Sequence, residues 1–179
     1  MKAKFFKQFT TALFFILSLG LMGCSEGKVD TPEENKESIV DLATVLKHRD
    51  SYVGDNSAIL AIVNHLPGNS YNQGIELQTM VEPYEITVHY QRFDQLTLRL
   101  AEDSRITSSF PHVLKMNAVI LLALVPNASI IHFQIDDGTL ITYHRKELEA
   151  EHQEVFGQEL NTIITNYETV EAFIRATKE

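Results

Sequence analysis

The sequence predicts an α+β domain in which an antiparallel sheet, built from two hairpins, carries helices packed on one face. Two pairs of segments alternate apolar and polar residues, and a short turn-forming segment joins the members of each pair, which is typical of hairpins. A dense apolar run separates the two pairs, and amphipathic segments stand before the first pair and after the second. Strands that follow one another across short turns favour antiparallel pairing.

Two short helices are expected before the first strand. Ser38 can cap a helix whose apolar residues recur at spacings of three, four and one, namely Ile39, Leu42, Val45 and Leu46. Residues 52–57 (Tyr-Val-Gly-Asp-Asn-Ser) then supply a turn and a second N-cap. The apolar residues that follow form the second helix, which Pro67-Gly68-Asn69 ends.

The first hairpin is expected over residues 75–79 and 86–90. Apolar residues alternate with polar ones in both segments, and Glu82-Pro83-Tyr84 lies between them. Leucines alternate again over residues 96–100, which indicates a third strand or an extension of the second. Residues 102–109 are polar and are expected to form a loop.

Residues 112–125 contain the densest apolar stretch after the N-terminal region, including eight consecutive apolar residues at 118–125. This stretch is shorter than the roughly 20 residues that a membrane span needs, so it predicts a buried helix. Pro126 and Asn127 end it.

The second hairpin is expected next, over residues 130–135 and 140–143. Asp136-Asp137-Gly138-Thr139 between them is typical of a tight turn. Residues 145–155 form an amphipathic pattern, and residues 161–176 predict a last helix.

Composition excludes several classes of protein. The 179 residues carry 15 Lys and Arg against 24 Asp and Glu, for a net charge of −9, so a nucleic-acid partner is not expected. The single cysteine excludes an internal disulfide and a zinc site built from several thiolates. An apolar content of 44% is that of a globular protein rather than a disordered one.

Residues 1–23 are typical of a bacterial lipoprotein signal peptide. Three lysines precede an apolar run of 14 residues, which is too short to span a bilayer comfortably. The segment Leu-Met-Gly-Cys at residues 21–24 resembles a lipobox, with cleavage expected after Gly23 and a diacylglyceryl group on the Cys24 thiol. The partner is then membrane lipid, and the location is the outer face of the bacterial cytoplasmic membrane. An ordinary secretory signal that contains a cysteine is the alternative.

An acidic tether is expected over residues 24–37, followed by a single globular domain over residues 38–179. Five acidic residues and few apolar ones make the segment after Cys24 a solvated spacer. As a flexible chain, it would hold the domain about 20 Å from the lipid surface.

Catalytic motifs are weak throughout the chain. Seven histidines invite a search for a metal site, but His-Glu-x-x-His is absent from the sequence, and no two histidines stand four residues apart. His144, Glu147, Glu151 and His152 could gather near one helix face, for which a solvated surface is the favoured interpretation. His89 and His132 are expected to be exposed or hydrogen-bonded, and Asp136-Asp137 is interpreted as part of a turn. No catalytic residue, metal ligand or cofactor is therefore assigned.

Several segments together resemble an uncharacterised family of domains found in Gram-positive bacterial lipoproteins and attached to membrane metalloproteases of the beta-lactam-sensor type. These segments are residues 52–57, 66–67, 74–79, 82–84, 86–88, 117–118, 121–124 and 127. The resemblance implies a lipoprotein location and a domain over roughly residues 45–160. It implies no catalytic residues.

Two functions remain open. The favoured one is a non-catalytic binding or sensory module, anchored outside the cytoplasmic membrane, whose partner is a protein, a peptide or a wall ligand. Tyr52, Asp55 and Asn56 are its candidate binding surface, although turn and N-cap chemistry also explains the last two. The alternative is an extracytoplasmic hydrolase whose carboxylates and histidines come together only in the fold.

Overall fold

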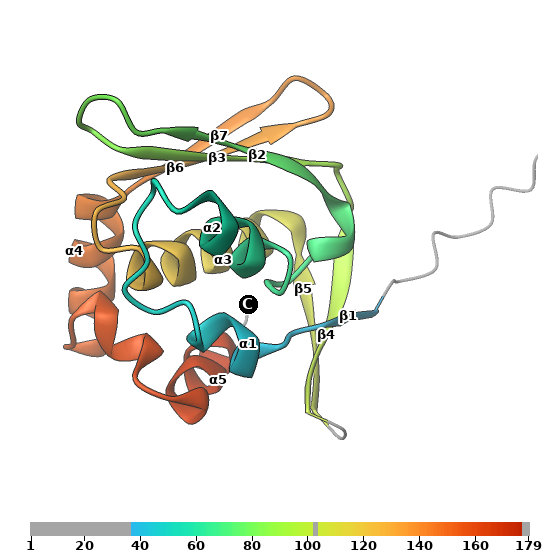
Figure 1. Ribbon diagram of the computed structural model, residues 1–179. Coiled ribbons are helices and arrows are strands. Elements are labelled where there is room, and N and C mark those ends of the chain that lie inside the picture. Colours follow the sequence, from blue (N-terminus) through green and yellow to red (C-terminus); the bar gives the residue numbers. More distant parts are fainter. Residues whose placement is uncertain (1–36, 102–103, 177–179) are drawn as a thin grey trace, which may run out of the picture. The chain divides into compact units, whose positions relative to one another are not determined.

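The computed structural model describes residues 37–101 and 104–176, and it confirms the α+β class (Figure 1). In these described residues, seven strands form two sheets, and five α-helices and two 3-10 helices accompany them. None of the described helices is long and apolar enough to cross a membrane.

The larger sheet contains both predicted hairpins and has the strand order β2-β3-β6-β7. Its strands are β2 (Asn72–Gln78), β3 (Glu85–Tyr90), β6 (Ile130–Ile135) and β7 (Leu140–His144). Each hairpin is antiparallel, but β3 and β6 run parallel, so the prediction of a purely antiparallel sheet was wrong. The cause is the long connection between the hairpins, which crosses below the sheet and brings β6 back in the direction of β3.

The smaller sheet has the order β1-β4-β5 and was largely missed. The leucine-rich strand β4 (Gln95–Ala101) belongs to this sheet and not to the first hairpin. The predicted polar loop at 102–109 was also wrong, because Ser104–Ser109 forms β5. In β5, Ile106 and Ser108 are buried, whereas Arg105 and Thr107 are exposed. Because five of the six residues of β5 are polar, the strand gave almost no hydropathy signal.

The first helix begins later than predicted. Glu37–Ile39 forms β1, parallel to β4, and Ser38 is buried with its Oγ accepting a hydrogen bond from the Gly68 N–H at 3.1 Å. The helix itself is α1 (Leu42–Leu46), and its cap is Asp41, whose Oδ1 accepts from the Thr44 N–H at 3.0 Å. A partner strand that lies far away in the sequence therefore overrode the local helical pattern.

Two helices, α2 (Asn56–Val63) and α3 (Phe110–Leu124), lie directly below the larger sheet (Figure 1). The inner sheet face consists of alternate residues of β3 and β6, namely Ile86, Val88, Tyr90, Ile131, Phe133 and Ile135. Of the 15 residues of α3, 12 are buried, which confirms the predicted buried helix. Because every residue of α3 from Met116 to Leu124 is buried, other elements have to cover this part of the helix on the side away from the sheet.

The C-terminal segment supplies that cover, together with α1 (Figure 1). It contains α4 (Arg145–Phe156), as predicted, but the expected helix over 161–176 is divided into a 3-10 helix, η2 (Leu160–Ile164), and α5 (Tyr167–Ala176). Asn166 causes the break, because its Oδ1 accepts from the Thr169 N–H at 2.9 Å and so begins a new helix.

Arg145 closes the C-terminal end of α3. Its guanidinium donates hydrogen bonds to the carbonyl oxygens of Leu122 at 2.8 Å, Val125 at 2.9 Å and Ala128 at 2.7 Å. The last carbonyls of a helix have no partner within it, so a cation there satisfies them and interacts favourably with the helix dipole.

We therefore predict that Arg145→Met lowers the free energy of unfolding by about 2 kcal/mol or more, since charge-assisted hydrogen bonds are lost. Urea unfolding measures the change. The control is Lys146→Met at the exposed neighbouring position, where a change within about 0.5 kcal/mol is expected. Equal losses in the two variants would contradict this role of Arg145.

Leu122 in α3 is fully buried, so Leu122→Ala should remove about 2–5 kcal/mol through lost contacts and a cavity. The matched control is Leu60→Ala, which makes the same change inside α2 at a side chain that is 38% exposed, and a loss of about 1 kcal/mol is expected there. Thermal unfolding of both variants tests this prediction. A parent-like melting temperature for Leu122→Ala would show that α3 is not the core helix.

Candidate functional site

Two of the cavities lie against α4 and are lined by different residues of this helix. The larger, of about 850 Å³, lies at the C-terminal end of α3 and includes Arg49, Arg145 and Glu149 in its lining. Both arginines are occupied: Arg145 binds the α3 carbonyls, and Arg49 donates to the carbonyl oxygens of Ile164 and Thr165. This cavity is therefore lined by cations that already hold the fold together.

The second cavity, of about 320 Å³, lies between α3, α4 and α5, and we call it the His152 cavity. Its apolar lining consists of Met116, Val119, Leu148, Val155, Phe156, Phe173 and Ala176. Its polar lining consists of His112, Lys115, Glu151 and His152. An apolar pocket with a few converging polar groups is the usual form of a small-molecule site.

His152 is the unusual residue of this cavity. Its side chain is buried, with 6% of the residue exposed, and its Nε2 has no hydrogen-bond partner. Its ring packs against Phe156 and Phe173, with centroid distances of 4.7 Å and 6.1 Å. Burial lowers the pKa of His152, because an apolar environment disfavours the charged imidazolium. The imidazole is therefore neutral at neutral pH.

An ion pair stands beside the imidazole. The Lys115 ammonium donates to the Glu151 carboxylate, and both side chains are about half exposed. The two opposite charges compensate each other, so the polar edge of the cavity carries no net charge from this pair.

The structure corrects the interpretation of the α4 residues as a solvated face. Glu147 is exposed, but His152 points inward and Glu151 is engaged with Lys115. Within the described ranges, no three or more His, Cys, Asp or Glu side chains are grouped so that they could hold a metal ion. The signal that could have revealed the site is His152 with Phe156 four residues later, since residues at this spacing meet on one helix face.

The loop before α2 contains the predicted binding surface. Asp55 is the N-cap of α2, and its Oδ1 accepts from the Ala58 N–H at 3.0 Å, while Tyr52 and Asn56 are exposed. The Val53 N–H donates to Asn127 Oδ1 at 3.0 Å, which ties the loop to the end of α3. Asp55 thus stabilises the start of α2, and none of the three residues lines the His152 cavity. Gly23 and Cys24 lie outside the described residues.

The histidines of the larger sheet lie on its outer face. His89 Nε2 is 3.1 Å from Glu76 Oε1, and His132 Nδ1 is 2.8 Å from Thr142 Oγ1. Both are hydrogen-bonded, as predicted.

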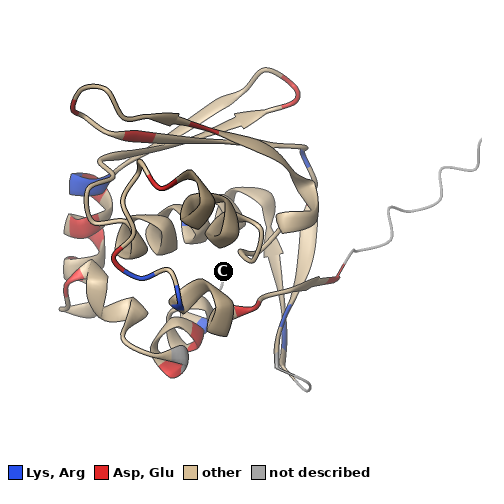
Figure 2. Ribbon diagram, in the orientation of Figure 1, with Lys and Arg blue, Asp and Glu red and all other residues tan. Residues whose placement is uncertain are grey.

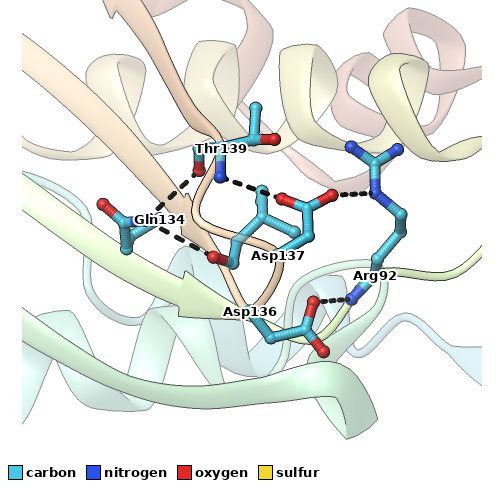
Figure 3. Close-up of polar contacts among 6 residues, drawn as sticks. Arg92, Gln134, Asp136, Asp137 and Thr139 are labelled. Atoms are coloured by element: carbon cyan, nitrogen blue, oxygen red, sulfur yellow. Dashed lines mark hydrogen bonds and ion pairs between the residues drawn. The ribbon is translucent and has the colours of Figure 1, made fainter.

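Asp136 and Asp137 form the turn between β6 and β7 (Figure 3). Asp136 Oδ1 accepts from the Arg92 N–H at 3.1 Å, and Asp137 accepts from the Thr139 N–H at 2.9 Å and from Arg92 Nε at 2.7 Å. The hydrogen bonds from Thr139, and then Arg92, lower the pKa of Asp137 to about 2. Both carboxylates accept backbone hydrogen bonds, and the interpretation as a turn is confirmed.

The mixed sheet, the buried crossover helix and the preformed cavity define an α+β domain with a candidate ligand pocket. Residues 45–146 match a family described as a domain of unknown function (DUF4825), and the chain belongs to this family. No curated protein and no solved structure matches the chain.

The matched segment ends within the first turn of α4. It contains both hairpins, α2 and α3, but His152, Phe156 and Phe173 lie beyond it. The His152 cavity is therefore formed by one helix of the matched domain and two helices of the segment that follows.

We predict that His152→Leu raises the free energy of unfolding by about 1 kcal/mol, because a buried nitrogen without a partner is replaced by an apolar side chain. His144→Leu, the same change at an exposed histidine, should leave stability unchanged. Thermal and urea unfolding measure both variants. A clear loss of stability in His152→Leu would show that the imidazole is a satisfied structural group.

A pH dependence follows from the lowered pKa of His152. The folded state binds the proton less readily than the unfolded state. The free energy of unfolding is therefore highest above the ordinary pKa of 6.5, and it falls as the pH drops through the lowered pKa of the folded state. Unfolding at about pH 7.5 and about pH 5.5 should show a larger drop for the parent than for His152→Leu. Equal losses of stability in the parent and in His152→Leu would show that another group causes the pH dependence.

Proposed function

We propose that this protein is a membrane-anchored extracytoplasmic lipoprotein that acts as a non-catalytic binding or sensory module. The proposed binding site is the His152 cavity. The proposed attachment is a diacylglyceryl group on Cys24, which would place the domain on the outer face of the bacterial cytoplasmic membrane. The lipobox at residues 21–24 and the basic and apolar segments before it support the attachment.

The observation that carries the binding role is a preformed apolar cavity that contains a buried imidazole with an unpaired nitrogen. Buried polar groups are normally hydrogen-bonded, and exceptions tend to occur at functional sites. The location of the cavity also suits a sensory role. A ligand there would contact both the central helix α3 and the two C-terminal helices, so its binding would stabilise their packing.

The alternative, an extracytoplasmic hydrolase, has less support. The residues that line the His152 cavity include no serine, threonine or cysteine that could act as a nucleophile. The one carboxylate in the lining, Glu151, is paired with Lys115. Since the lining has no serine, it does not offer a Ser-His-Asp arrangement.

The binding role is tested by blocking the cavity. Ala176 is exposed on α5 and lines the His152 cavity, so Ala176→Trp should fill it without disturbing the core. Ala150→Trp is the matched control, because Ala150 is exposed on α4 and lines the larger cavity instead. Mass spectrometry of small molecules released from the purified full chain should detect a compound with the parent and with Ala150→Trp, but not with Ala176→Trp. The same compounds in all three samples, or none in any, would count against the proposal.

For the anchor, we predict that Cys24→Ala moves the processed protein from the detergent phase to the aqueous phase in detergent phase partitioning. Without the thiol, no diacylglyceryl group can be attached, and two acyl chains are what hold a protein stably on a membrane. The control is Ser25→Ala, which keeps the cysteine and should stay in the detergent phase. Retention of processed Cys24→Ala on membranes at high salt would contradict lipid anchoring.

A further inference from the structure

We infer that the His152 cavity binds a small neutral amphiphile, with one or two apolar rings or a short branched chain and a single hydroxyl group that hydrogen-bonds to the His152 imidazole. This inference rests on the proposed binding function, because it names the class of ligand for the same cavity.

The size and lining of the cavity define the apolar part of the ligand. A volume of about 320 Å³ is at the lower end of the range for small-molecule pockets. A dry apolar cavity of about 150 Å³ already holds benzene, so there is room for one or two rings. Phe156, Phe173 and Met116 line the cavity, and both aromatic rings and thioethers pack well on an aromatic guest.

The charges around the cavity favour a neutral ligand. Lys115 and Glu151 compensate each other, so an anion would have to displace Glu151 from the ammonium and then lie beside that carboxylate. A cation would meet the corresponding repulsion from Lys115. The chain as a whole is acidic, which further disfavours an anionic ligand.

The buried imidazole defines the polar part of the ligand. A hydroxyl group both donates and accepts, so it suits whichever ring nitrogen of a neutral histidine it meets. Nε2 has no partner in the protein and is shielded from water. The proposed binding therefore includes a rotation of the imidazole toward the ligand, after which the hydroxyl satisfies a nitrogen that is otherwise unpaired.

The test uses three probes of the same shape: p-cresol, p-xylene and 4-methylbenzoate. They carry a hydroxyl, a methyl and a carboxylate group at the same ring position. The protein is the full mature chain with Cys24→Ala, so that no detergent competes for the probes. NMR titration should give an affinity for p-cresol about tenfold higher than for p-xylene, as expected for one buried hydrogen bond, and weaker binding of 4-methylbenzoate than of either. Only p-cresol should shift the ring nitrogen signals of His152.

Variants separate the inference from the proposed function. In His152→Leu the tenfold preference for p-cresol should vanish, whereas His144→Leu should keep it, and Ala176→Trp should weaken all three probes. An equal affinity for p-cresol and p-xylene in the parent, a preference that survives in His152→Leu, or tightest binding of 4-methylbenzoate would overturn the ligand class and leave the binding function standing. Absence of saturable binding, or binding that Ala176→Trp does not weaken, would overturn both.

Discussion

The complete burial of α3 from Met116 to Leu124 is the constraint on which the rest of the structure depends. A helix with this surface cannot face water, so the larger sheet covers one side and α1, η2 and α5 cover the other (Figure 1). Charged residues are accordingly found on the outer elements, and α2 and α3 carry few of them (Figure 2). The His152 cavity lies where this cover is completed by α4 and α5, beside residues of α3 itself.

A buried polar group sets the orientation of α3 within this cover. Asn117 is fully buried, and its Nδ2 donates to the Pro67 carbonyl oxygen at 2.8 Å and to the Tyr90 hydroxyl at 3.2 Å. These bonds join α3 to the turn after α2 and to the end of β3. Apolar contacts are not directional, so they alone would allow α3 to rotate about its axis with little change in buried area. The hydrogen bonds of Asn117 favour one of these rotations over the others.

The elements that could be predicted from the sequence are those with a local cause. Both hairpins and the buried helix follow from hydrophobic periodicity and from turn residues such as Gly138. The parallel pairing of β3 with β6, and of β1 with β4, depends on contacts between distant segments and left no local pattern. The site was missed for the same reason. His152 looks like one polar residue of an amphipathic helix, and only the packing of α4 against α3 and α5 turns it inward.

The claim that α3 is covered both by the sheet and by the C-terminal helices is tested most directly by native-state hydrogen exchange on the full chain. If the account is right, the amides of Ile120 to Leu124 exchange only through global unfolding, with the same free energy as the central amides of β3 and β6. If the C-terminal helices are instead a loose addition to the matched domain, α4, η2 and α5 will open first. The α3 amides will then exchange at a lower free energy than those of the sheet, and that result would contradict the account.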